Sequence, residues 1–381
     1  MTRDAVDAED AEALVALLQR LIRAASPDPP GDERAVAAVV AAELEGRGLA
    51  PTVEEFAPGR FNVIARVRGA GERPALVFSA HMDTLPAGEG AWTHPPFDGV
   101  RADGHVYGRG ACDMKSGLAA MIVAAAALER AEAPPPGDVI LAVTGGESSN
   151  CLGARRLAAT DALADAGALL VSEPSSLAVV IAHKAALWLR ATAHGRAGHL
   201  SAGDGGGRNA IAMMLAALAD LGEALPADAH PLLGRASLTV GRIRGGEAIN
   251  LTAERCTADL DVRLLPGHDP AAVERALRGR LGDGFGLERL DFKPAVETAV
   301  DDPFVVACRA AVRAVGGEAA APGGAAYFTD ACVLAAAFDL PTVIIGPGRL
   351  GGSGAVDERV AVADLVTAAR LYRDIAASRL G

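Results

Sequence analysis

Short apolar runs alternate with helical segments along most of the chain, and this alternation limits the possible folds more than any other feature. The runs 61–67, 75–80, 138–144 and 167–172 are largely apolar, as expected for strands that are buried on both faces. A long alanine-rich helix is expected over about 116–131, between the second and third runs. The pattern predicts an α/β fold in which helices cover both faces of a mostly parallel sheet.

The pattern changes near residue 180. The segment 186–195 alternates apolar and polar residues, as a half-exposed antiparallel strand does. The order strand-helix-strand-strand-helix-strand follows, which is typical of a ferredoxin-like α+β domain. We therefore expect one α/β domain, formed by 1–180 and 297–381, that is interrupted by an inserted domain at 181–296.

Composition and charge exclude several classes of protein. The 381 residues include 48 acidic and 36 basic side chains, a net charge of -12, and no basic run that would bind nucleic acid. The longest uncharged apolar stretch, 117–128, is shorter than the roughly 20 residues that cross a bilayer. Five scattered cysteines form no disulfide framework, and no signal peptide is visible. We expect a cytoplasmic protein with neither nucleic acid nor a membrane as its partner.

Polar side chains that bind metals or move protons follow the ends of the expected strands. His81 and Asp83 follow the strand at 75–80, Glu147 follows the next buried strand, and Glu173 lies in the sequence SEP after the last. Asp113 lies in a glycine-rich segment just before the long helix. The carboxyl ends of parallel strands meet at one edge of a sheet, so these residues could share one site. Imidazole and carboxylate ligands favour a divalent metal such as zinc.

The segment HMDTLPAGEGAWTHPPFDGVRADGHVYGRGACDMKSG, which begins at His81, resembles the metal site of a zinc-dependent amidohydrolase family. That family includes acetylornithine deacetylase, succinyl-diaminopimelate desuccinylase, aminoacylase-1 and glutamate carboxypeptidase. AHKAALWLRATAHGRAGHLS resembles the entry to the family's inserted dimerisation domain, and NLTAERCTADLDVRLLPG resembles its exit. The resemblance covers nearly the whole chain and implies a homodimer.

The resemblance implies a role for each residue at the metal site. His81 and Glu173 would bind one metal, and Asp113 would bridge it to a second. Asp83 would hydrogen-bond His81 and fix its tautomer. Glu147 would be the general base that takes a proton from the attacking water and passes it to the leaving amine.

Further residues are expected to bind the substrate. By the resemblance, His199 of the inserted domain would stabilise the oxyanion in the partner subunit's site, and Asn250 and Arg263 would bind the substrate. The Arg263 guanidinium suits a bidentate contact with a carboxylate. Thr329 is a further candidate hydrogen-bond donor to the substrate.

Two positions depart from the family pattern. The family has two consecutive glutamates where this chain has Glu147 followed by Ser148, and a histidine ligand where it has Gly354. Both missing groups ligate the same metal in the family, whereas His81, Asp113 and Glu173 are intact. Because a metal site needs about three or four protein donors, we expect one zinc per chain.

Four other residues are alternatives for the lost ligands. Cys112 and Cys151 lie close to the site in sequence, although the favoured interpretation is that they are small buried apolar residues. Asp357 and Glu358 follow the missing histidine, although a solvated surface loop is the favoured interpretation there.

The leading hypothesis is a single-metal hydrolase that cleaves the amide bond of an N-acyl amino acid or small peptide. A repurposed member that catalyses amide formation, acyl transfer or cyclisation is the alternative. A non-catalytic homologue that binds an amino acid is a third hypothesis.

Overall fold

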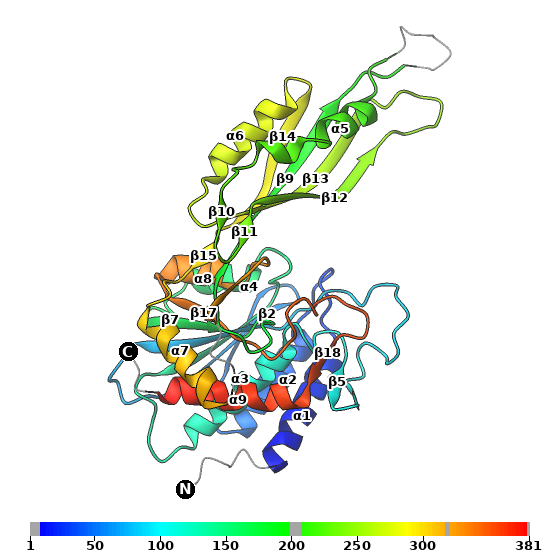
Figure 1. Cartoon of the computed structure of the whole chain (residues 1–381). Helices are drawn as coiled ribbons and strands as arrows, with labels where there is room; N and C mark the ends of the chain where they lie inside the picture. The colour runs from blue at the N-terminus through cyan, green and yellow to red at the C-terminus, as the bar shows by residue number, and fades with distance from the viewer. Residues whose placement is uncertain (1–7, 199–206, 317–320, 379–381) are drawn as a thin grey trace. The chain divides into compact units, whose positions relative to one another are not determined.

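The computed structural model describes residues 8–198, 207–316 and 321–378. The chain divides into two compact units (Figure 1). Unit 1 consists of Met1–Ile181, Glu297–Gly323 and Thr329–Gly381, and unit 2 consists of Ala182–Val296 and Gly324–Phe328. No helix in the described part of the chain is long and apolar enough to cross a membrane.

The main sheet is mixed, with a parallel centre and antiparallel edges. Its strands follow the order β1 (Thr52–Ala57), β2 (Arg60–Val67), β6 (Val139–Thr144), β3 (Ala75–His81), β7 (Ala166–Val171), β17 (Thr342–Ile344), β8 (Val180–His183) and β15 (Val296–Glu297), and β16 (Gly323–Ala325) pairs with β8. Strands β6, β3, β7 and β17 pair in parallel, whereas β1, β2 and β8 pair antiparallel. The expected α/β fold is confirmed, with its parallel part confined to the centre of the sheet.

Helices cover both faces of this sheet because the chain reverses direction within it. The step from β3 to β6 runs one way along the sheet, and the step from β6 to β7 runs the other way. Right-handed crossovers therefore place the helices of the two steps on opposite faces. On one face lie α1 (Ala8–Arg23), α2 (Arg34–Gly46), α3 (Lys115–Glu129), α7 (Pro303–Ala314) and α9 (Val362–Ala377), and on the other lie α4 (Leu152–Ala158) and α8 (Ala331–Phe338) (Figure 1).

The core of unit 1 is centred on α3. Nearly every residue of this helix is buried, since α1 and α9 pack against it on one side and the sheet on the other. Its sequence is apolar all round, as expected for a helix without a solvent face. A small sheet of β18 (Arg359–Ala361), β5 (His105–Tyr107) and β4 (Val100–Ala102) completes this unit.

Unit 2 is built on an antiparallel sheet in the order β12 (Ser237–Gly245), β13 (Arg255–Leu264), β9 (Ala185–His194) and β14 (Phe285–Lys293). Strand β9 alternates buried and half-exposed residues, as its sequence predicts. The side chains of one sheet face pack with α5 (Ala210–Leu218) and α6 (Pro270–Leu281). The 3₁₀ helix Leu221–Ala224 and the hairpin of β10 (Ala229–His230) and β11 (Gly234–Arg235) complete the unit. This strand order and the two helices have the ferredoxin-like arrangement.

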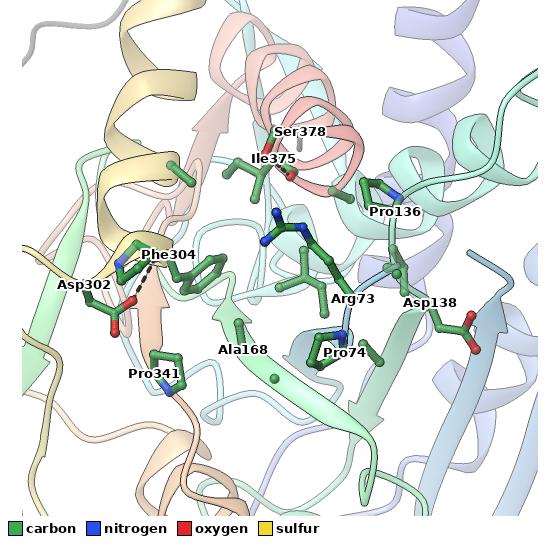
Figure 2. Close-up of a pocket in the computed structure, with 18 residues that line it drawn as sticks. Arg73, Pro74, Pro136, Asp138, Ala168, Asp302, Phe304, Pro341, Ile375 and Ser378 are labelled. Carbon is green, nitrogen blue, oxygen red and sulfur yellow. Dashed lines mark hydrogen bonds between the residues drawn. The ribbon is translucent and has the colours of Figure 1, made fainter. Parts of the chain in front are cut away.

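A cavity of about 330 Å³ lies at the amino ends of the central strands of unit 1 (Figure 2). Leu76, Val139 and Ala168 belong to β3, β6 and β7, and Phe304 and Ile375 reach it from α7 and α9. The polar residues that follow these strands lie at the opposite, carboxyl edge of the sheet. The cavity therefore contains none of the candidate site residues.

Candidate active site

The parallel strands bring three of the expected site residues to one edge of the sheet. His81 is the last residue of β3, Glu147 lies three residues beyond the end of β6, and Glu173 lies two residues beyond the end of β7. Since β3 is the neighbour of both β6 and β7, these positions are adjacent. Asp113 lies in the turn that leads into α3.

The side chains of His81, Asp113 and Glu173 converge on one point. The Nε2 atom of His81 lies 3.2 Å from Oδ1 of Asp113 and 3.5 Å from Oε1 of Glu173. Ligands about 2.0–2.1 Å from a tetrahedral zinc ion lie roughly 3.3 Å apart, so the spacing fits a zinc site. Among the described residues, no other group of His, Cys, Asp and Glu places three ligand atoms within 4.8 Å of one another.

His81 and Glu173 are buried and Asp113 is half-buried, and the charges of the three side chains favour a bound cation. Burial lowers the pKa of His81, but Glu173 and the other neighbouring carboxylates outweigh it and raise the pKa well above its ordinary value. Burial and the nearby Asp113 raise the pKa of Glu173 to about 8. Burial would also raise the pKa of Asp113, but the hydrogen bond and charge of His81 lower it overall. The site is short of positive charge, which a divalent metal would supply.

Glu147 is buried beside this group. Burial raises its pKa well above the ordinary value, and the charges of Glu173 and Asp330 raise it further, while His81 acts in the opposite direction. A carboxylate with a raised pKa can hold a proton near neutral pH, as a general base that also returns its proton must do.

Asp83 has a different contact from the one expected. Its backbone carbonyl, rather than its carboxylate, lies 2.9 Å from Nδ1 of His81, and the nearest carboxylate oxygen is 3.8 Å away. The carboxylate instead accepts hydrogen bonds from the backbone N–H groups of Glu147 and Ser148, both at 3.0 Å. Asp83 therefore orients His81 through its backbone and supports the turn of Glu147 through its side chain.

Glu358 is buried, which corrects the interpretation of this segment as a solvated loop. Its Oε1 accepts hydrogen bonds from the backbone N–H groups of Gly110, Cys112 and Asp113, at 2.9–3.1 Å, and its other oxygen pairs with Arg109. Its carboxylate thus holds the turn that presents Asp113 and is not part of the ligand group. Asp357 binds the backbone and side chain of Thr93.

The two cysteines are also outside the ligand group. Cys112 is buried, and its Sγ lies 3.4 Å from the Arg349 carbonyl. Cys151 is buried with its Sγ 3.7 Å from that of Cys332. Burial raises the pKa of Cys112, and the contact with Cys332 together with burial raises that of Cys151. Both have the character of packed apolar residues.

Ser353 and Gly354 lie in the segment where the sequence departs from the family pattern. Gly354 has a φ of +74°, and its carbonyl accepts a hydrogen bond from Arg109 at 3.1 Å. Its neighbour Ser353 donates a hydrogen bond to Oδ2 of Asp113. Sequence reasoning missed Ser353, because a serine beside a glycine carries no signal of its own.

Thr329 lies just before α8. The residue is fully buried, and its Oγ1 accepts a hydrogen bond from the backbone N–H of Ala331 at the start of α8. The neighbouring Asp330, which the sequence suggested as a pocket-lining residue, is a buried carboxylate. It accepts a hydrogen bond from Thr144 and acts electrostatically on Glu147.

The remaining expected residues belong to unit 2. Asn250 is exposed in the turn after β12, and Arg263 lies on β13. Arg263 pairs with Asp261 at 2.8 Å and stacks over Phe328, but its Nη1 is buried without a hydrogen-bond partner in the described structure. His199 lies outside the described residues.

Comparisons with known proteins agree with this geometry. The model of peptidase family M20/M25/M40 matches residues 77–378. A succinyl-diaminopimelate desuccinylase of Rhodospirillum centenum is 31% identical over 388 residues, which cover 95% of this chain and 96% of that protein.

Solved structures share the fold. An M20 family metallo-carboxypeptidase from Sulfolobus solfataricus has a TM-score of 0.79 at 17% identity, covering 97% of this chain and 99% of that one. A dinuclear metal-binding M20 peptidase from Bacillus subtilis has a TM-score of 0.72 at 16% identity, covering 97% and 98%. The family match and the desuccinylase similarity show that this chain is a metal-dependent hydrolase that belongs to peptidase family M20/M25/M40.

Proposed function

We propose that this chain hydrolyses the amide bond of a small N-acylated amino acid or peptide, with one zinc ion held by His81, Asp113 and Glu173. The observation that carries the proposal is the convergence of these three side chains, two of them buried and Asp113 half-buried, beside Glu147. The names of its relatives, a desuccinylase and a carboxypeptidase, agree with this substrate class.

Each residue has a role in this reaction. Bound zinc would supply Lewis acidity at the carbonyl to be cleaved. Glu147 takes a proton from the attacking water and passes it to the leaving amine. Arg263 binds a carboxylate of the substrate, for which its buried Nη1 has a free hydrogen-bond donor. Asn250 and His199 are proposed to contact the substrate and the developing oxyanion.

The contacts of Asp113 favour a single metal. One of its oxygens faces His81, and the other accepts a hydrogen bond from Ser353. A carboxylate that bridged two metals would use both oxygens as ligands. With Ser148 and Gly354 at the expected ligand positions, this chain offers a second metal too few donors.

We also propose that two copies pair through the edge strand β12. This nine-residue strand lies at the end of the unit 2 sheet, so one of its edges has no partner strand among the described residues. Val240 and Ile243 on β12 and Leu215 on α5 are 38–60% exposed. Exposed strand edges that carry apolar side chains favour association. A symmetric pair would cover the β12 edge of each copy. Ile243→Lys should give a monomer in sedimentation velocity, and an unchanged dimer would exclude this interface.

The function is tested by measuring hydrolysis of N-succinyl and N-acetyl amino acids and dipeptides by the zinc-loaded protein. Glu147→Gln should lower kcat on the best substrate by about 10³-fold while zinc content stays the same, because only the base is removed. Glu72→Gln, an exposed position, makes the same chemical change as a control and should match the unmodified protein. Full activity of Glu147→Gln would remove the general base from the proposal.

A further inference from the structure

The turn that carries Glu147 has an unfavourable backbone conformation. Asn150 and Cys151 have φ angles of +72° and +55°, in the left-handed region that side chains rarely adopt, and Gly146 also has a positive φ. Non-glycine residues stay in this region only when the surrounding structure holds them there. The contacts that hold this turn therefore determine where Glu147 lies.

One contact beyond that of Asp83 comes from the N-terminal part of the chain. The Oγ of Ser149 donates a hydrogen bond to Oδ1 of Asp28 at 2.7 Å. The other oxygen of Asp28 accepts a hydrogen bond from Nη1 of Arg60 at 2.9 Å. Asp28 is 3% exposed and Arg60 is 9% exposed, so water screens this arrangement little.

Asp28 is fixed relative to Asp83 by the backbone. Its N–H donates to the carbonyl of Thr84 at 2.8 Å, and the N–H of Thr84 donates to the carbonyl of Ser26 at 3.0 Å. The segment 26–28 therefore runs beside the residues that follow β3. Asp28 and Asp83, whose carboxylates contact the turn, therefore lie on two segments that are hydrogen-bonded to each other.

Arg60 holds the Asp28 carboxylate in place. The same Nη1 that binds Asp28 also donates to Oε1 of Glu33 at 2.6 Å, and Nη2 lies 3.3 Å from Oγ of Ser149. A guanidinium held by several partners has little freedom to rotate. Arg60 and Asp28 therefore restrict the position of the turn that carries Glu147. Neither residue is a proposed metal ligand.

We propose that Ser149, Asp28 and Arg60 are positioning residues that set the place of the Glu147 carboxylate during amide hydrolysis. The inference rests on the proposed role of Glu147 as the base. Ser149 transmits the position of Asp28 to the turn, and Arg60 fixes Asp28. Loss of the Ser149 hydroxyl lowers the fraction of molecules in which Glu147 is placed to take the proton.

The test is steady-state kinetics of full-length Ser149→Ala, with zinc content and Tm measured on the same samples. We expect kcat to fall by about 10-fold to 100-fold, as for other residues that orient a catalytic group, with KM within about twofold. Ser149→Thr restores a hydroxyl and should recover most of kcat. Thr367→Ala is the control, since it removes a hydroxyl that donates to a backbone carbonyl at 2.8 Å on α9.

Three results would overturn the inference. The first is a kcat for Ser149→Ala within twofold of the unmodified protein while Glu147→Gln is inactive, in which case only this inference fails. The second is a loss of zinc or a large fall in Tm that accounts for the lost activity, which would make the contact merely structural. The third is full activity of Glu147→Gln, in which case the proposed function fails as well. Asp28→Asn, which breaks the contact with Arg60, should change kcat in the same direction.

Discussion

Unit 1 contains two clusters of buried carboxylates, and they differ in the source of their positive charge. Asp28 and Glu33 share the guanidinium of Arg60, which lies 2.9 and 2.6 Å from their oxygens. Among the described residues, Asp113 and Glu173 share the imidazole of His81, and Asp83 is a further carboxylate close by. The first cluster is balanced mainly by the protein itself, whereas the second needs a cation from solution. Buried carboxylates alone therefore do not mark a metal site; the missing countercharge does.

The largest expected effect is at the cluster of His81, Asp113 and Glu173. His81→Ala removes the ligand that contacts both carboxylates, so it should abolish tight zinc binding and reduce kcat/KM by at least about 10³-fold. His105→Ala, in the turn at β5, should keep both properties. Zinc content by mass spectrometry and hydrolysis rates measure the two outcomes. Tightly bound zinc in His81→Ala would show that the cation is held elsewhere.

At the cluster of Asp28, Glu33 and Arg60, the expected effect is on stability. Arg60→Met leaves two buried carboxylates without their cation and should lower the free energy of unfolding by about 3 kcal/mol. Arg34→Met breaks an exposed pair with Glu55, at 2.8 Å, and should lower the free energy of unfolding much less. Urea unfolding of the zinc-free proteins compares them. Equal effects would mean that burial does not distinguish the two ion pairs.

Glu33 should make stability depend on pH. Burial and the charge of Asp83 raise its pKa to about 7, despite Arg60, from 4.5 in the unfolded chain. The folded state therefore holds the proton more tightly, and the contribution of Glu33 to stability is greatest below pH 4.5 and falls as the pH rises to 7. Glu33→Gln cannot titrate, so it should gain stability relative to the unmodified protein, on the order of 3 kcal/mol, between pH 4.5 and 8. Parallel pH profiles of the two proteins would contradict the raised pKa.

The proposal of a single metal is tested by restoring the two family ligands. Ser148→Glu combined with Gly354→His restores both family ligands, and zinc content should rise from one to two per chain. The histidine would adopt a φ of +74°, and its Cβ would lie 3.2 Å from Leu85, so the variant should be less stable by about 1–3 kcal/mol. A variant that still binds one zinc would show that other ligands set the number of metals.

The sequence predicted the parts of the molecule that depend on periodicity and missed those that depend on distant contacts. Buried strands such as β3 and β6 are largely apolar, so their positions could be predicted, and with them His81 and Glu147. Strand β1 was missed because its residues are mostly exposed or half-exposed and include polar side chains on both faces.

The residues that position the site, Glu358 and Asp28, were missed for a different reason. Glu358 binds backbone amides about 245 positions earlier in the chain, and Asp28 binds Ser149 across 121 positions. Sequence patterns do not record such pairings. Sequence reasoning named Thr329 as a hydrogen-bond donor to substrate but did not predict that its Oγ1 accepts a hydrogen bond from the N–H of Ala331, the first residue of α8.

The central claim is that this chain holds one zinc ion through His81, Asp113 and Glu173. The most direct test is native mass spectrometry of the purified full-length protein after saturation with zinc and removal of loosely bound metal. We predict one zinc per chain in the unmodified protein and none in His81→Ala. Two zinc ions per chain, or none in the unmodified protein, would contradict the claim.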